Sequence, residues 1–179
     1  MTQITLAVTG SISAYKAADI TSQLTKLGLE VKVLMTPAAR KFITPLTLQV
    51  LSKHQVGLDV MIEDDPQRIE HIDIGKETDL FLVAPASANT IAKLAMGLAD
   101  NMVTSTALAL PQTTKKLLAP AMNTKMLEHP ATQRNLKLLQ DYGYQIIQPR
   151  EALLACGDKG SGALASVETI VETVKENCL

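Results

Sequence analysis

Short apolar runs, separated by stretches with helical spacing, dominate the hydrophobic pattern of this chain. After the first run, Ala17, Ile20, Leu24 and Leu27 recur every three or four residues, and Gly28 follows as a stop signal. This pattern predicts a strand, a helix and a second strand, and the same alternation continues along the chain. The predicted strands are residues 4–8, 31–35, 80–84, 116–119 and 145–147.

The third run, residues 80–84, is apolar at every position rather than at every second one. Central strands of a parallel sheet have this pattern because helices cover both of their faces. We therefore predict an α/β fold with a doubly wound open parallel sheet, flavodoxin-like or Rossmann-like. No repeat, low-complexity tract or linker divides residues 1–179, so we expect a single domain. Residues 101–110 are apolar on most faces of a predicted helix, which favours burial against another subunit.

Composition narrows the class of protein. With 17 Lys and Arg against 18 Asp and Glu, the net charge is -1, so no broad positive field exists to bind nucleic acid or an acidic membrane surface. Residues 4–8 are too short for a membrane span and carry no signal-peptide pattern, so we expect a cytoplasmic protein. Cys178 is next to the C-terminus, which argues against a disulfide with Cys156, and the three histidines are scattered, so we expect no metal site.

Ligands of an open parallel sheet bind beyond the carboxyl ends of the strands, so the loops there are the candidate sites. The first loop, GSISAYK at residues 10–16, opens a helix whose free amides suit a phosphate. A simple turn with Ser13 as the helix N-cap is equally favoured. The loop lacks the three-glycine dinucleotide fingerprint, which disfavours NAD. Thr36 and Pro37 follow the second strand and predict another helix start, so a mononucleotide phosphate could bridge the two loops.

Two later loops each combine proline, small residues and asparagine directly after a strand. They are PASANT at residues 85–90 and PAMNTKM at residues 120–126. On its own, each loop is most simply a capped turn. Ser87 or Asn89 would cap the predicted helix at residues 90–96, and Asn123 would be a capping residue in the later loop. Together their amide groups could recognise a flat heteroaromatic ring and a carboxylate.

Cys156 stands among three glycines in residues 154–162, a stretch that predicts a flexible loop able to close over a substrate. Because this loop is polar, a functional thiol is favoured over a packed structural cysteine. His71 alternates with apolar residues, and on spacing alone it is more simply a half-buried packing histidine.

Taken together, the GSISAYK, PASANT and PAMNTKM segments and ACGD at residues 155–158 resemble the homo-oligomeric flavin-containing cysteine decarboxylases. The resemblance covers nearly the whole chain and implies flavin mononucleotide (FMN) as cofactor. The ACGD segment is typical of the branch whose substrate is 4'-phosphopantothenoylcysteine. Matched by position, the residues implied to line FMN are Gly10, Ser11, Ile12, Thr36, Pro37, Ser87, Ala88, Asn89, Thr90 and Ala121.

The resemblance also implies catalytic roles. His71 would be the base, Asn123 would bind the substrate carboxylate, and Cys156 would be the acid that completes the reduction. Leu153, Ala155 and Leu164 would lie near the substrate. Homo-oligomers, trimers or dodecamers of trimers with flavin between subunits, are implied as well.

Three alternatives remain at this point. A flavin prenyltransferase shares the fold and the FMN site but lacks the Asn123 and Cys156 loops. A peptidyl-cysteine decarboxylase shares the chemistry but lacks the ACGD segment. A non-catalytic flavin-binding regulatory subunit of a phosphatase is typically extended by long acidic segments, which this sequence does not contain.

Overall fold

The predicted strands all form, and they pair into one parallel sheet. The computed structural model describes residues 2–63, 65–153, 157 and 159–178. The sheet contains β1 (Gln3–Val8), β2 (Glu30–Met35), β3 (Leu80–Ala86), β4 (Lys115–Pro120) and β5 (Tyr144–Ile146), in the spatial order β2-β1-β3-β4-β5. This is the strand order of a flavodoxin-like doubly wound sheet, so the predicted fold class is confirmed.

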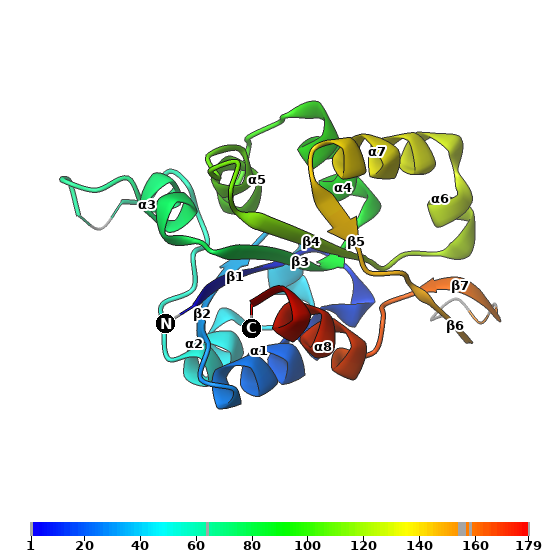
Figure 1. Ribbon diagram of the computed structural model, residues 1–179, viewed down its shortest axis with the longest axis horizontal. Helices are drawn as coiled ribbons and strands as arrows, with labels where there is room; N and C mark the ends of the chain where they lie inside the picture. The colour runs from blue at the N-terminus through cyan, green and yellow to red at the C-terminus, as the bar shows by residue number, and fades with distance from the viewer. Residues whose placement is uncertain (1, 64, 154–156, 158, 179) are drawn as a thin grey trace.

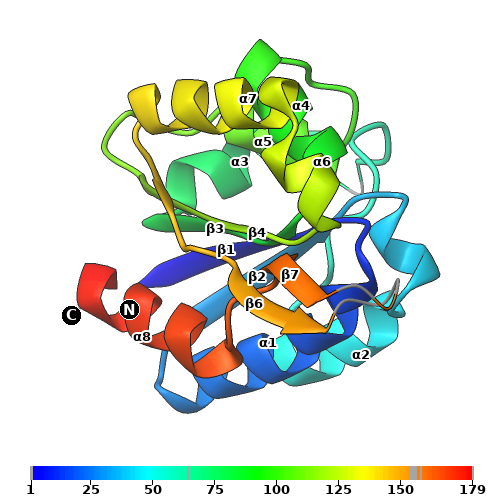
Figure 2. The same ribbon diagram turned by 90° about the vertical axis from the view of Figure 1, so that its right-hand side faces the viewer.

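Helices cover both faces of the sheet (Figures 1 and 2). One face carries α1 (Ala17–Lys26), α2 (Pro45–Ser52) and α8 (Val167–Cys178). The other carries α3 (Glu70–Glu77), α4 (Ala88–Met96), α5 (Met102–Leu108) and α7 (Pro130–Asp141), with the short α6 (Thr124–Glu128) leading into α7. Two 3-10 helices, η1 (Ile12–Lys16) and η2 (Ala39–Lys41), follow β1 and β2.

Neighbouring residues of the central strand β3 serve two separate cores. Leu82 packs in the cluster that contains Ile20 of α1 and Ile170 of α8, whereas Phe81 packs in the cluster that contains Ile91 of α4. Successive side chains of a strand point to opposite faces, and both faces are covered here. That explains why β3 is apolar at every position.

Residues 159–162, the last part of the segment 154–162 that we predicted as a flexible loop, belong instead to a strand. Residues 154–156 and 158 of that segment lie outside the described residues. Lys159–Ala163 forms β7, which pairs antiparallel with β6 (Arg150–Leu153) as a separate two-stranded sheet. Tertiary hydrogen bonds hold this hairpin: the Met122 amide donates to the Gly162 carbonyl (2.9 Å), and the Thr124 hydroxyl donates to the Ser161 carbonyl (2.6 Å). Their partners are distant in sequence, so local composition could not reveal them.

Two local predictions were wrong in detail. Thr36 does act as a capping residue, because its hydroxyl accepts from the Ala39 amide at 3.2 Å, but the segment that follows is the short η2 and not an α-helix. The next α-helix, α2, begins only at Pro45. Ser11, rather than Ser13, caps η1, because the Ser13 amide donates to the Ser11 hydroxyl at 3.3 Å. Both errors come from tight 3-10 turns, which have no clear sequence signal.

The strand order also locates the crevice. β1 lies between β2 and β3, so the connections that leave β1 and β3 run to opposite faces of the sheet and leave an opening between them. In the described part of the chain, no helix has both the length and the apolar character needed to span a membrane.

Candidate functional site

A cleft of about 550 Å³ lies at the carboxyl ends of the strands, lined by the loops there and by the β6–β7 hairpin. Figure 2 shows the hairpin beside this end of the sheet. Its size is within the range of small-molecule and cofactor sites. Sequence-predicted site residues from four separate segments line it: Gly10, Ser11, Ile12, Ser87, Ala88, Ala121, Asn123 and Leu164. The fold thus brings together most of the loops that the sequence singled out.

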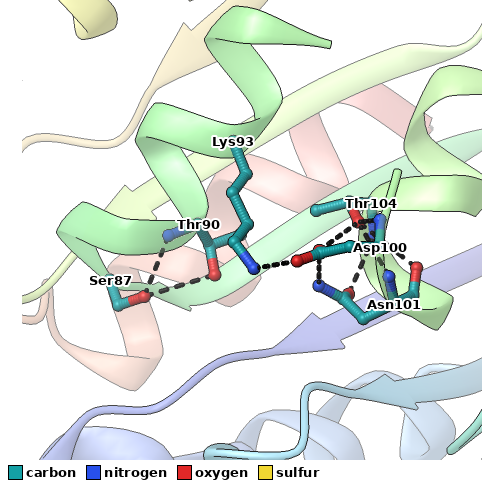
Figure 3. A network of polar contacts seen from close by, with 6 residues as sticks. All are labelled: Ser87, Thr90, Lys93, Asp100, Asn101 and Thr104. Carbon is teal, nitrogen blue, oxygen red and sulfur yellow. Dashed lines mark hydrogen bonds and ion pairs between the residues drawn. The ribbon is translucent and has the colours of Figure 1, made fainter. Parts of the chain in front are cut away.

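Thr9 fixes the loop after β1 to the loop after β3. Its fully buried hydroxyl donates to the Pro85 carbonyl (2.6 Å) and accepts from the Ser87 amide (2.9 Å). Ser87 in turn caps α4, because its hydroxyl accepts from the Thr90 amide at 3.2 Å (Figure 3). Ser87 is therefore the cap and Asn89 is not. Asn89 is exposed on the first turn of α4.

A second polar network joins the C-terminal end of α4 to the start of α5 (Figure 3). Asn101 and Thr104 form a reciprocal capping box at the start of α5, and Lys93 of α4 pairs with Asp100. The helix that begins at the cleft is thus anchored at its far end as well.

Gly10 allows the loops after β1 and β2 to approach each other. A Cβ atom at Gly10 would lie 2.5 Å from the Cβ of Ala38, closer than any ordinary contact. Thr36 is buried just before Ala38, while Phe42, which follows η2, reaches the cleft. Thr36, Pro37, Asn89 and Thr90 do not line the cleft themselves.

The loop after β4 lies between the loop after β3 and the hairpin. The Ala121 amide donates to the Ala86 carbonyl at 3.1 Å, and Met122 bonds to the hairpin as described above. Asn123 caps α6, its side-chain oxygen accepting from the Lys125 amide at 2.9 Å. The capping interpretation of Asn123 and its place at the cleft are therefore compatible.

The charge of the cleft comes from two residues that the sequence analysis did not assign, Lys16 and Arg150. Among the described residues that line the cleft there is no Asp or Glu. Burial lowers the pKa of Lys16, Arg150 lowers it further, and Glu168 of α8 partly offsets both effects. The cleft is thus locally positive in a chain whose net charge is -1.

His71 is not part of this cleft. It lies in α3, which packs against α5, and Figure 1 shows α3 and the β6–β7 hairpin at opposite ends of the molecule. Its Nδ1 atom is buried and has no hydrogen-bond partner among the described residues. Ala155 and Cys156 lie outside the described residues, and for Leu153 only the backbone, in β6, is described.

Sequence reasoning also missed Tyr15, Phe42 and Met126, which line the cleft with apolar surface. Tyr15 and Lys16 belong to a motif that had been singled out, so their positions could have been inferred. Arg150 and Phe42 carried no such signal, because only the hairpin and the turn after β2 bring them to the site.

The cleft fits a flavin mononucleotide in size and lining. Small residues such as Gly10, Ala88 and Ala121 line part of it, and Tyr15 and Phe42 add flat apolar surface. Ser87, Asn123 and the two cations are polar groups able to orient a ligand. The strand order and this crevice together define a mononucleotide-binding α/β protein.

Comparisons with known proteins agree. The chain belongs to the Flavoprotein family, whose defining sequence pattern matches residues 1–179. It is 63% identical over 174 residues to a probable phosphopantothenoylcysteine decarboxylase of Streptococcus mutans, covering 97% of each chain. It is 47% identical to the coenzyme A biosynthesis bifunctional protein CoaBC of Bacillus subtilis, of which it covers 42%. Among solved structures, a PPC decarboxylase mutant complexed with pantothenoylaminoethenethiol is similar, with a TM-score of 0.90 and 32% identity, over 98% of this chain and 97% of that one.

Proposed function

We propose that this chain is an FMN-dependent decarboxylase that converts 4'-phosphopantothenoylcysteine to 4'-phosphopantetheine in coenzyme A biosynthesis. The observation that carries the proposal is the cleft, where Ser87 and Ala121 stand beside Asn123 and the hairpin. The 63% identity to the Streptococcus mutans protein over nearly the full length of both chains supports the choice of substrate. We expect the enzyme to act in the cytoplasm.

FMN would be held by Gly10, Ser11, Ile12, Ser87, Ala88 and Ala121, which line the cleft. Thr36, Pro37, Asn89 and Thr90 stay predicted FMN residues, although they do not line the cleft of a single copy. When bound, FMN would supply a two-electron acceptor that is restored at the end of the cycle, so no external oxidant or nicotinamide would be consumed. The protein contributes binding, orientation and proton transfer.

Asn123 would bind the substrate carboxylate. Its amide is neutral, so it orients the carboxylate without stabilising its charge strongly against departure as carbon dioxide. His71 would accept the thiol proton as the carbon bearing sulfur is oxidised to a thioaldehyde. The C=S group then lies β to the carboxylate and accepts the electron pair of the breaking C–C bond, which gives an enethiol.

Cys156 would donate the proton that accompanies reduction of the enethiol. A thiol with a pKa near ~8.5 is protonated at neutral pH and acidic enough to transfer the proton. Leu153, Ala155 and Leu164 would contact the substrate around this residue. Of these three, Leu164 is buried at the cleft, with 1% of its surface exposed.

We further propose a homo-oligomer in which His71 of one copy reaches the cleft of another. Two apolar surfaces support this arrangement. One surrounds α3 and includes Met61, Ile62 and Ile69, which are more than half exposed. The other surrounds the cleft and includes Ile12 and Tyr15. Two different surfaces that pair head to tail form a ring when the rotation between copies closes, and a threefold ring is what a trimer, or trimers assembled into a dodecamer, requires.

The experiment is a decarboxylation assay with purified, FMN-loaded protein. We expect multiple turnovers of 4'-phosphopantothenoylcysteine to 4'-phosphopantetheine without nicotinamide, and no turnover of a peptide with a C-terminal cysteine. Turnover of the peptide alone would identify a peptidyl-cysteine decarboxylase instead. A protein that binds no FMN would overturn the proposal altogether.

Subunit complementation tests the shared site. His71→Asn and Asn123→Asp variants should each be inactive, and co-assembly of the two should restore part of the activity, because some sites then combine His71 from one copy with Asn123 from another. If the mixed oligomer stays inactive while both variants assemble and bind FMN, the two residues do not act across a subunit boundary.

A further inference from the structure

Two cations converge on the cleft from elements far apart in the sequence. Lys16 is the last residue of η1, and Arg150 is the first residue of β6. Both line the cleft, and no described residue forms an ion pair with either of them. Glu168, at the start of α8, is the nearby acidic group and does not line the cleft. In the described part of the chain, two positive charges therefore line the cleft and no negative charge does.

Only one of the three nitrogens of the Arg150 guanidinium donates a hydrogen bond to a described residue. Its Nε donates to the Leu164 carbonyl at 3.1 Å, which joins the open ends of the β6–β7 hairpin. This bond orients the planar group, and among the described residues nothing accepts a hydrogen bond from the two terminal nitrogens, so they can donate to a ligand. A guanidinium fixed in this way suits a phosphate, which accepts two parallel hydrogen bonds.

The surroundings of Lys16 disfavour its positive charge. Burial and the neighbouring Arg150 both oppose its charge. An anion bound between the two cations would relieve this repulsion, so the pair favours an occupant with negative charge.

We infer that Lys16 and Arg150 form the binding site for the terminal phosphate of the substrate. The inference rests on the proposed function and adds to it the residues that recognise the phosphorylated end. The phosphate of FMN is the other possible occupant with the same chemistry. The substrate phosphate is favoured because Arg150 is bonded to Leu164 and shares the hairpin with Leu153, residues expected near the substrate. The residues expected at the flavin follow β1, β2, β3 and β4, and Lys16 is in the β1 segment with some of them, so it is Arg150 that favours the substrate phosphate.

The test compares two substrates in the FMN-loaded oligomer, 4'-phosphopantothenoylcysteine and its dephosphorylated form, pantothenoylcysteine. The variants are Lys16→Met, Arg150→Met and Arg150→Lys, and Lys26→Met is the matched control, an exposed lysine of α1 away from the cleft. For Lys16→Met and Arg150→Met, we expect the preference in kcat/KM for the phosphorylated substrate to fall by about 10- to 100-fold, the usual loss for a charged hydrogen bond. Arg150→Lys keeps the positive charge but cannot donate two parallel hydrogen bonds. The preference of this variant for the phosphorylated substrate should therefore fall less. Lys26→Met should keep the wild-type preference.

Three results would overturn the inference. An equal fall for both substrates would mean that the cations support the hairpin rather than the phosphate. Loss of FMN absorbance from Lys16→Met, with the substrate preference unchanged, would assign the cations to the flavin phosphate. A wild-type enzyme without preference would show that the phosphate is not recognised.

Calorimetry with phosphopantetheine and pantetheine repeats the comparison without turnover. We expect the wild-type protein to bind the phosphorylated compound more tightly, and Lys16→Met to lose that difference. If the wild-type protein shows this difference but no decarboxylation, the proposed function fails while the phosphate site stands.

Discussion

The contact between Gly10 and Ala38 gives a direct test of the cofactor site. In Gly10→Ala, the new Cβ would lie 2.5 Å from the Cβ of Ala38. Carbon atoms in favourable contact are about 3.5–4.0 Å apart, so the two loops would have to separate by about 1 Å or more. Overpacking of this kind costs roughly 1–3 kcal/mol. If that cost falls on the FMN-bound arrangement of the loops, the Kd for FMN rises about 5- to 150-fold.

A double-mutant cycle isolates this contact. FMN binding is measured by titration of flavin fluorescence, and stability by thermal unfolding of the apoprotein. Ala38→Gly removes the opposing methyl group, so Gly10→Ala/Ala38→Gly should recover most of the lost affinity. Gly97→Ala is a control for destabilisation alone. The φ of +68° at Gly97 strains any side chain, but a Cβ there meets nothing within 4 Å and the residue does not line the cleft. This variant should therefore lower the thermal stability without weakening FMN binding. Wild-type affinity in Gly10→Ala, or a double variant no better than the single one, would refute the reasoning.

Four further variants test other parts of the site. His71→Asn should abolish decarboxylation and leave FMN absorbance intact, since His71 does not line the cleft; loss of the fold would favour a packing role instead. Cys156→Ser should still release carbon dioxide but accumulate a product lighter by two hydrogens by mass spectrometry, because an alcohol is a weaker acid than a thiol; normal turnover would remove the thiol from the mechanism. Thr9→Val should lower the free energy of unfolding in urea by about 1–3 kcal/mol, because the Pro85 carbonyl and Ser87 amide lose their partner; an unchanged midpoint would contradict this. Gly162→Ala, with φ at +135° and a Cβ 2.3 Å from the Met122 carbonyl, should lose activity but retain FMN; full activity would mean that the hairpin tolerates displacement.

The elements of the fold could be read from the sequence because each has a local cause. The uniform apolar character of β3 follows from helices on both faces, and the spacing of Ala17, Ile20 and Leu24 follows from the single buried stripe of α1. The loops that supply Gly10, Ser87 and Asn123 could be identified because ligands of parallel sheets bind at the carboxyl ends of the strands.

The hairpin could not be predicted in the same way. Residues 159–162 belong to the segment that we predicted as a flexible loop, because glycine has high conformational freedom in the unfolded chain. In the folded chain, hydrogen bonds from Met122 and Thr124 hold this segment as β7. Because the bonding partners are far apart in sequence, no local pattern contains this information.

The sequence by itself determined the α/β class, the strand positions and the residue types available at each loop, since all of these depend on local periodicity and turn chemistry. Only the tertiary structure decided which loops share one cleft, because strand order and hairpin docking are long-range choices. It brought Lys16 and Arg150 to the same cleft from opposite ends of the chain, and it left His71 outside that cleft. The physical reason is that a side chain's chemistry is encoded at its own position, whereas its neighbours are set by packing of the whole chain.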